Sequence, residues 1–343
     1  KRLFVLGWNK SEWHNRRSSD GNPQNFILKN QMMLNKITLL FILFAGLMHS
    51  QSKNIKFASD DYFDKQVATT IQQLELDKDF EVGDDGIEQI SLALIDLNSE
   101  QPILSGYNYD NFIYPASVYK MYVAAEVLNQ ISLGEYSLNT INVVKSPNDV
   151  DKSKEIKSDP RPLLRNGDSV TVEYLLDLMI TRSDNTAANC LIDIAKRPRI
   201  NDMMHSYDWF GSEVTRKFLS RKFEDPGYDT VKSTETNARH AAEFLYRIYT
   251  GTLINYWVSS QMKSFLGRQL DKSKLAQGLT GDVMMYHKTG WWSFWTHDVA
   301  IIDNGHTKYI IACFLPLKEE LALPKMRELA TLIHKLMINR HHK

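Results

Sequence analysis

Three apolar segments near the end of the chain most constrain its fold, because turn-length connections join them. Residues 283–289 (VMMYHKT), 298–303 (DVAIID) and 308–315 (KYIIACFL) each have the length and composition of a buried β-strand. Strands joined by short turns pair as antiparallel neighbours. Residues 90–97 and 101–107 form another such pair across a polar turn. The sequence therefore predicts an antiparallel sheet whose strands come from both ends of one domain.

Helical patterns occupy most of the remaining chain. Residues 60–75 repeat apolar side chains at helical spacing after an acidic start, and residues 121–133 form an apolar helix that ends at Gly134. Residues 324–338 predict a closing helix with a proline at its start. The predicted fold class is α+β: an antiparallel sheet flanked by N- and C-terminal helices, with a mostly helical lobe over about residues 115–275. A cleft between sheet and lobe is the expected site.

Composition excludes several classes of function. The chain has 343 residues, of which 43% are apolar and 24% charged, and its formal net charge is zero. A neutral chain carries no electrostatic footprint for nucleic acid or for an anionic membrane surface. Cys190 and Cys313 form no disulfide framework, although a single bridge between them stays open, and the ten histidines are scattered. We expect no metal, no cofactor and a monomer.

The segment from Met33 to Ser52 has the pattern of a secretory signal. Lys36 gives the positive end, and residues 37–48 form an apolar run that is short for a bilayer. We expect an upstream segment plus signal over residues 1–52, with the signal at about 33–50, and an exported catalytic domain over residues 53–343. We expect the natural start at Met32 or Met33; the alternative is an uncleaved anchor with residues 1–36 in the cytoplasm.

One short stretch, YPASVYKM at residues 114–121, suggests a nucleophile. Pro115 favours a helix start, so Ser117 lies where backbone N–H groups are free and the helix dipole is positive. Lys120 is one turn further on the same face, and burial would lower its pKa enough for the neutral amine to accept the serine proton. The alternative is an ordinary helix start, because the same S-x-x-K spacing occurs at Ser50 and at Ser260.

Two further tripeptides favour the catalytic interpretation. S-D-N occurs at residues 183–185 between two helical segments, and K-T-G occurs at residues 288–290 on a predicted strand. The order S-x-x-K, S-D-N, K-T-G is the signature of class A β-lactamases and penicillin-binding proteins. Over about residues 60–340 the chain resembles the class A β-lactamase-like serine hydrolases, which share the penicillin-recognising (β-lactamase/transpeptidase-like) fold.

The resemblance implies a role for each matched residue. Ser117 is the acylated nucleophile, Lys120 accepts its proton, directly or not, and Ser183 relays a proton to the leaving nitrogen. Asp184 and Asn189 would support the site without reacting. The residues implied in substrate binding are Asn185 for an amide, Lys288 and Thr289 for a carboxylate, and Trp291, whose backbone N–H would form the oxyanion hole with that of Ser117.

The match weakens after the S-D-N segment. The loop over residues 218–234 lacks the family's usual R-x-E start, so Glu224 is the best candidate for the base that releases the acyl group, with Asp225 second; both can equally be solvated carboxylates. Tyr228 stands where an asparagine is usual. No arginine lies between Arg268 and Arg327 to assist in carboxylate binding, so two alternatives stay open: Lys288 and Thr289 act alone, or Thr296 or His297 helps them. The bulky WWSFW at residues 291–295 is expected to line the cleft, with hairpin packing as the alternative.

The sequence predicts an exported (periplasmic or secreted) bacterial serine β-lactamase, with a role in β-lactam catabolism or antibiotic resistance. It would hydrolyse β-lactam amide bonds through a Ser117 acyl-enzyme. The expected partner is a small β-lactam or peptidoglycan-like substrate. Two alternatives stay open: a D,D-peptidase-like or other serine amidohydrolase on the same fold, and a non-catalytic penicillin-binding-like module.

Overall fold

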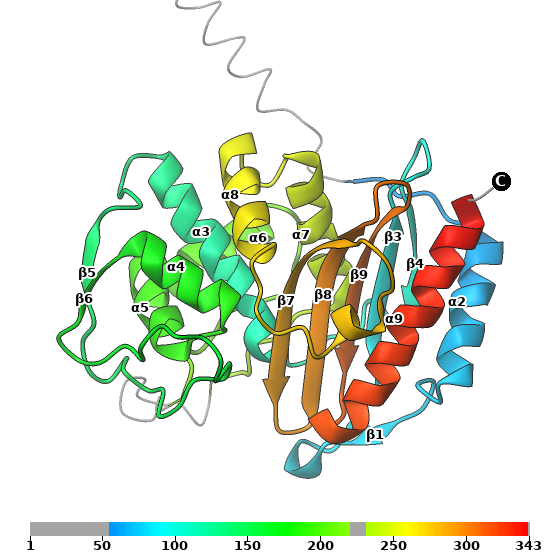
Figure 1. Cartoon of the computed structure of the whole chain (residues 1–343), viewed down its shortest axis with the longest axis horizontal. Helices are drawn as coiled ribbons and strands as arrows, with labels where there is room; N and C mark the ends of the chain where they lie inside the picture. The colour runs from blue at the N-terminus through cyan, green and yellow to red at the C-terminus, as the bar shows by residue number, and fades with distance from the viewer. Residues whose placement is uncertain (1–54, 220–230, 342–343) are drawn as a thin grey trace, which may run out of the picture. The chain divides into compact units, whose positions relative to one another are not determined.

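A five-stranded antiparallel sheet forms the centre of the fold (Figure 1). The computed structural model describes residues 55–219 and 231–341. The chain divides into two units, 1–53 and 54–343, and the described residues all belong to the second. The strand order is β4-β3-β9-β8-β7, which confirms the predicted sheet. The strands are β3 (Ser91–Asp96), β4 (Ile103–Tyr107), β7 (Met284–Trp292), β8 (Trp295–Asp303) and β9 (Lys308–Leu315).

Each strand of the sheet alternates its side chains between two apolar clusters. On β9, Ile310, Ala312 and Phe314 join one cluster, while Ile311 and Cys313 join the other. This alternation follows from the two-residue period of a strand, and it buries the sheet on both faces. The hairpin from β7 to β8 turns at residues 293–294, two residues beyond the K-T-G segment.

Helices α2 (Asp61–Gln73) and α9 (Glu319–His341) cover one face of the sheet (Figure 1). Asp60 caps α2 by accepting the backbone N–H groups of Tyr62 and Phe63. The predicted start of the last helix at Pro324 is wrong, since Pro324 lies inside α9. The helix begins earlier because Glu319 and Glu320 suit its positive end and Ala322 is buried against the sheet.

The other face carries α7 (Ala238–Thr250), which contacts β3, β8 and β9, and beyond it the helical lobe. A 3₁₀ turn, η3 (Ala116–Tyr119), precedes α3, so Ser117 lies in this turn and not in the first turn of the α-helix. The lobe's remaining elements are α3 (Lys120–Ser132), β5 (Ile141–Val143), β6 (Ser169–Thr171), α4 (Val172–Thr181), α5 (Asn185–Ala195), α6 (Arg197–His205) and α8 (Tyr256–Leu266). The short pieces outside the lobe are β1 (Phe80–Glu81), η2 (Gly83–Asp85), β2 (Ile87–Glu88) and η6 (Leu275–Gly278).

The sequence left open the pairing of the two thiols and the choice between a cleaved signal and an anchor at about residues 33–52, and this second segment lies outside the described residues. Cys190 on α5 and Cys313 on β9 are both buried free thiols, so the possible bridge between them does not form. Across residues 55–219 and 231–341, no helix combines the length and the apolar character that a membrane span requires.

One arginine ties the terminal helices to the sheet. Arg340 on α9 donates from Nε to Asp96 Oδ2 on β3 at 2.9 Å and from Nη2 to Asp60 Oδ2 at 2.6 Å. Its guanidinium also lies 4.7 Å from the ring centroid of Phe63 on α2. Asp96 is fully buried, so this carboxylate depends on its cationic partners.

We expect Arg340→Ala to lower the free energy of unfolding by about 3 kcal/mol, because it leaves the buried Asp96 carboxylate without its guanidinium partner and with only His341 Nε2, at 2.9 Å, as an ionisable neighbour. Urea denaturation of the purified protein measures the change. The exposed Lys335 on the same helix is the matched control, and Lys335→Ala should stay within about 0.5 kcal/mol of the wild type. Equal stabilities of the two variants would contradict this role for Arg340.

Candidate functional site

The turn that carries Ser117 is tightly held against strand β7. Ala116, just before it, has φ +46°, a left-handed conformation that costs a non-glycine residue about 1–3 kcal/mol. Gly290 packs directly against this turn: a Cβ at Gly290 would lie 2.9 Å from Pro115 O and 3.2 Å from Ser117 N. The K-T-G glycine is therefore required by the close approach of the two backbones. Ser117 is 8% exposed and lines the cleft beside it.

Lys120 lies at the centre of the buried polar cluster. Its Nζ is 3.0 Å from Ser117 Oγ, 3.1 Å from Ser183 Oγ and 2.8 Å from Asn185 Oδ1. It also donates to the backbone carbonyl of Ser183. Ser183 has φ +63°, so the backbone of the α4–α5 junction is itself in the left-handed region. The first two motifs therefore meet at one amine.

Lys288, from the third motif, reaches the same hydroxyl from the sheet. Its Nζ is 3.1 Å from Ser183 Oγ and 2.7 Å from the Thr289 carbonyl oxygen. Lys288 is fully buried, whereas the sequence led us to expect its charge at the cleft surface. It therefore acts on the cleft through Ser183, which is contacted by both lysines.

Burial weakens both lysines as cations. It lowers the pKa of Lys120 from its ordinary value near 10.5 to about 8, partly opposed by the carboxylates of Glu155, Asp151 and Asp184. Burial also lowers the pKa of Lys288, and the neighbouring charge of Lys120 lowers it further. Since one ammonium disfavours the other, the pair readily holds a neutral amine near neutral pH. A neutral Lys120 can accept a proton from Ser117.

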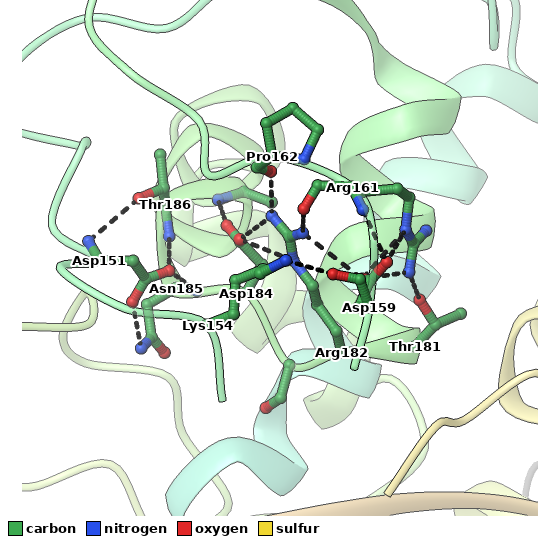
Figure 2. Close-up of polar contacts among 12 residues, drawn as sticks. Asp151, Lys154, Asp159, Arg161, Pro162, Thr181, Arg182, Asp184, Asn185 and Thr186 are labelled. Atoms are coloured by element: carbon green, nitrogen blue, oxygen red, sulfur yellow. Dashed lines mark hydrogen bonds and ion pairs between the residues drawn. The ribbon is translucent and has the colours of Figure 1, made fainter. Parts of the chain in front are cut away.

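A buried ion-pair network holds the junction between α4 and α5 in place (Figure 2). Arg182 Nη2 lies 2.8 Å from Asp184 Oδ2, and Arg182 Nη1 lies 3.4 Å from Asp159. Arg182 also donates to the carbonyl groups of Arg161 and Pro162. The second oxygen of Asp184 caps α5 by accepting the Ala187 N–H at 2.7 Å. Both carboxylate oxygens of Asp184, the middle residue of S-D-N, therefore have partners that hold the junction in place.

Asp151 is a site residue that the sequence did not identify (Figure 2). Its carboxylate accepts the Asn185 N–H at 2.7 Å, the Asn185 side-chain amide at 2.8 Å and the Thr186 N–H at 3.1 Å. It therefore orients Asn185 so that Oδ1 faces Lys120. Asp151 belongs to the polar stretch 145–168, which carries no motif and which the sequence predicted only as a loop.

Asn189 binds the backbone of Phe218 with both ends of its amide. Nδ2 donates to Phe218 O at 2.9 Å, and Phe218 N–H donates to Oδ1 at 2.7 Å. The Phe218 ring stacks on Tyr119 with centroids 4.5 Å apart and planes 9° apart. The Lys120 Nζ lies 4.3 Å from the centroid of the same ring. The sequence placed Phe218 at the start of the loop over residues 218–234 but did not assign it to the site.

The cleft beside these groups has a volume of about 760 Å³. Ser117, Ser183 and Asn185 line it, while Lys120 and Lys288 lie behind them. Aromatic side chains form much of the remaining wall. They are Phe112, Tyr114, Tyr119, Phe218, Trp291, Trp292 and Trp295, so three tryptophans of the WWSFW segment do line the cleft.

The remaining predicted binding residues differ in their surroundings. Thr289 Oγ1 is buried and has no hydrogen-bond partner among the residues that the structure describes. Thr296 and His297, proposed as helpers of Lys288, are committed elsewhere: Thr296 donates to Leu317 O at 2.9 Å, and His297 Nε2 lies 2.9 Å from Tyr114 O. Burial lowers the pKa of His297 to about 3, so it is neutral.

Two further expectations concern the loop that would carry the base for acyl release and the presence of a metal site. Glu224, Asp225 and Tyr228 lie outside the described residues. Within 55–219 and 231–341, no group of three or more His, Cys, Asp or Glu is arranged to hold a metal ion.

We expect Asp151→Ala to lower the free energy of unfolding by about 2 kcal/mol, because three N–H donors lose their acceptor in a largely buried position. The exposed Lys152 next to it gives the matched control, Lys152→Ala, for which urea denaturation should show no significant change. A D151A protein as stable as this control would show that the contacts of Asp151 do not support the site.

Comparisons with known proteins identify the family and the fold. The model of the β-lactamase enzyme family matches residues 66–337. A mutant of PBP-A, solved as its acyl-enzyme complex with penicillin G, is 15% identical with a TM-score of 0.67, over 82% of this chain and 98% of that one. The β-lactamase of Sphaerobacter thermophilus is 19% identical with a TM-score of 0.67, over 80% and 98%. An ancestral class A β-lactamase is 21% identical with a TM-score of 0.63, over 80% and 99%.

The comparison with curated proteins gave no match. The solved structures share the fold, with its antiparallel sheet and helical lobe, at low sequence identity. The family model, in contrast, spans most of the chain and includes all three motifs. The chain belongs to the β-lactamase enzyme family.

Proposed function

We propose that the protein is a β-lactamase-like serine hydrolase that opens β-lactam amides by forming an acyl-enzyme on Ser117. The observation that carries this proposal is the 3.0 Å contact between Lys120 Nζ and Ser117 Oγ, in a buried cluster at the edge of a cleft. Family membership supports the hydrolase class. The acyl-enzyme of a PBP-A mutant with penicillin G supports the covalent step.

The cluster supplies a complete route for the proton. Neutral Lys120 takes the proton of Ser117 as its Oγ attacks the lactam carbonyl. Lys120 also lies 3.1 Å from Ser183 Oγ, so the proton passes to Ser183 and then to the lactam nitrogen as the C–N bond breaks. Lys288, 3.1 Å from the same oxygen, stabilises negative charge that develops there. The product is an ester between Ser117 and the opened lactam.

The surroundings of the cleft support the proposed binding roles. Gly290 brings β7 against the Ser117 backbone, so the N–H groups of Ser117 and Trp291 are suited to hold the oxyanion. Thr289 and Lys288 are buried behind the cleft wall, so their proposed role is to favour a substrate carboxylate through local positive potential and not by direct contact. The aromatic wall suits an apolar side chain on the substrate. A β-lactam or a peptidoglycan-like peptide combines these features.

The proposal includes export. The pattern over residues 33–50 is that of a cleaved signal, which would place the catalytic domain outside the cytoplasm. N-terminal sequencing of the protein recovered from a bacterial periplasm or culture medium locates the cleavage; recovery of the whole chain in the membrane fraction would contradict it.

We expect brief exposure to penicillin G to add the mass of one penicillin to the wild-type protein, and Ser117→Ala to abolish this adduct. Intact-mass spectrometry over time measures it. Ser260→Ala is the matched control, since Ser260 begins the other S-x-x-K of the catalytic domain but lies on the exposed side of α8. An adduct that survives in S117A, or none in the wild type, would refute the assignment of Ser117.

We expect the rate of acylation to rise with pH and to level off above about pH 8, because Lys120 acts as a neutral amine and its pKa is lowered to about 8. Well below that pH the neutral fraction grows about tenfold per pH unit, and the rate should follow it. Stopped-flow acylation by a chromogenic cephalosporin between pH 5.5 and 9.5 measures the profile. A rate that stays flat across this range would exclude Lys120 as the titrating base.

A further inference from the structure

The aromatic ring of Phe218, in the segment that follows α6, lies against Lys120. Phe218 is nearly buried, lines the cleft and places its ring centroid 4.3 Å from Lys120 Nζ. It stacks flat on Tyr119, which directly precedes Lys120. Among the described residues, the hydrogen-bond partners of Lys120 Nζ are oxygens of Ser117, Ser183 and Asn185. The ring therefore fills the side of the amine that these oxygens leave open.

The position of this ring is fixed by its backbone. The fully buried Asn189 on α5 holds both the N–H and the carbonyl of Phe218, at 2.7 and 2.9 Å. The preceding residue is also anchored, since Lys217 Nζ lies 2.9 Å from Asn148 Oδ1 and 2.9 Å from Asp193 Oδ1. Two successive residues are thus tied to the helical lobe. Moving the Phe218 backbone away from α5 would require these contacts to break, and rotating the ring away from Lys120 would break its stacking on Tyr119.

Release of an acyl group to water needs two things at this place. A water oxygen must reach the ester carbonyl carbon, and a base must take its proton while the bond from that carbon to Ser117 Oγ breaks and Oγ regains a proton. An aromatic ring supplies no base and excludes water. Asp151 and Asp184, the carboxylates that hold the S-D-N segment, already accept N–H groups or pair with Arg182. Glu155 lines the cleft and its charge acts on Lys120, but it is not hydrogen-bonded to the reacting groups. Among the described residues, no carboxylate forms a hydrogen bond with Lys120 or Ser117.

We propose that Phe218 shields the Ser117 acyl-enzyme from water and makes its release the slow step. This inference rests on the proposed acylation of Ser117. The protein then forms the β-lactam ester readily but keeps it, and behaves toward penicillins as a trap with slow turnover. Phe218 is a shielding residue, and Asn189 is the positioning residue that holds it.

Time-resolved intact-mass spectrometry tests this with penicillin G in excess, followed by rapid removal of free drug. For the wild type we expect the adduct to form within seconds to minutes and to persist at least about ten times longer than it took to form. Phe218→Glu places a carboxylate where the ring lies, and we expect release to be about 100-fold faster. Acylation of this variant should be slower than that of the wild type, because the new carboxylate favours the charged form of Lys120, so the rate of release is measured separately on the adduct once formed. Phe218→Gln, of similar shape and without a base, should accelerate release by less than about tenfold.

Each outcome decides a separate question. A wild type that releases penicillin as fast as it is acylated, with a lasting adduct only in Glu224→Gln, would assign release to Glu224 and overturn the role of Phe218. Unchanged release in both Phe218 variants, once each is acylated, would also overturn it. If F218E fails to fold or to acylate, F218Q decides alone: faster release supports shielding and unchanged release refutes it. Absence of any adduct on wild-type Ser117 refutes the proposed function instead.

Discussion

The site depends on two amines that meet at one hydroxyl. Lys120 and Lys288 come from different parts of the fold, are both fully buried, and each lie 3.1 Å from Ser183 Oγ. Two buried ammonium groups repel each other and are shielded from solvent. Both effects lower their pKa values and favour deprotonation of one of them. The same proximity that makes the cluster costly as a pair of cations suits it to the proposed proton relay. The repulsion between Lys120 and Lys288 therefore underlies the chemistry that we propose for the cluster.

Holding this cluster requires that three separate segments approach closely. The 3₁₀ turn with Ser117 touches β7 at Gly290, where a side chain would collide with Pro115 O. The α4–α5 junction enters from the lobe, with Ser183 in a left-handed conformation and Asp184 bound to Arg182. Strain at Ala116 and Ser183 is local, and the two large apolar clusters on either face of the sheet stabilise the whole against it. The fold thus positions side chains that local preferences alone would not bring together.

The parts of this arrangement that follow a period or a spacing were predictable. The strands around the K-T-G segment, the helix of Phe63 and the three motifs are local patterns, and they define the sheet and the Ser117–Lys120 pair. Asp151 was not predictable, because it contacts Asn185 across a long, patternless loop and only the folded chain brings them together. The start of α9 at Glu319 was missed because Pro324 was taken as the first residue of the helix, although acidic residues that favour a helix start precede it. Long-range contacts leave no periodic signal in a sequence.

The contact between Phe218 and Lys120 separates the two halves of the reaction. The proposed acylation uses only groups that the three motifs bring together. Release depends on what faces Lys120 from the segment after α6, and Asn189 fixes that position by clamping the Phe218 backbone. A carboxylate six residues further along, at Glu224, would have to reach the ester by a path that this ring does not already occupy. The motifs that identify the family therefore predict the bond that we propose on Ser117, while one aromatic residue outside them would govern how long that bond lasts.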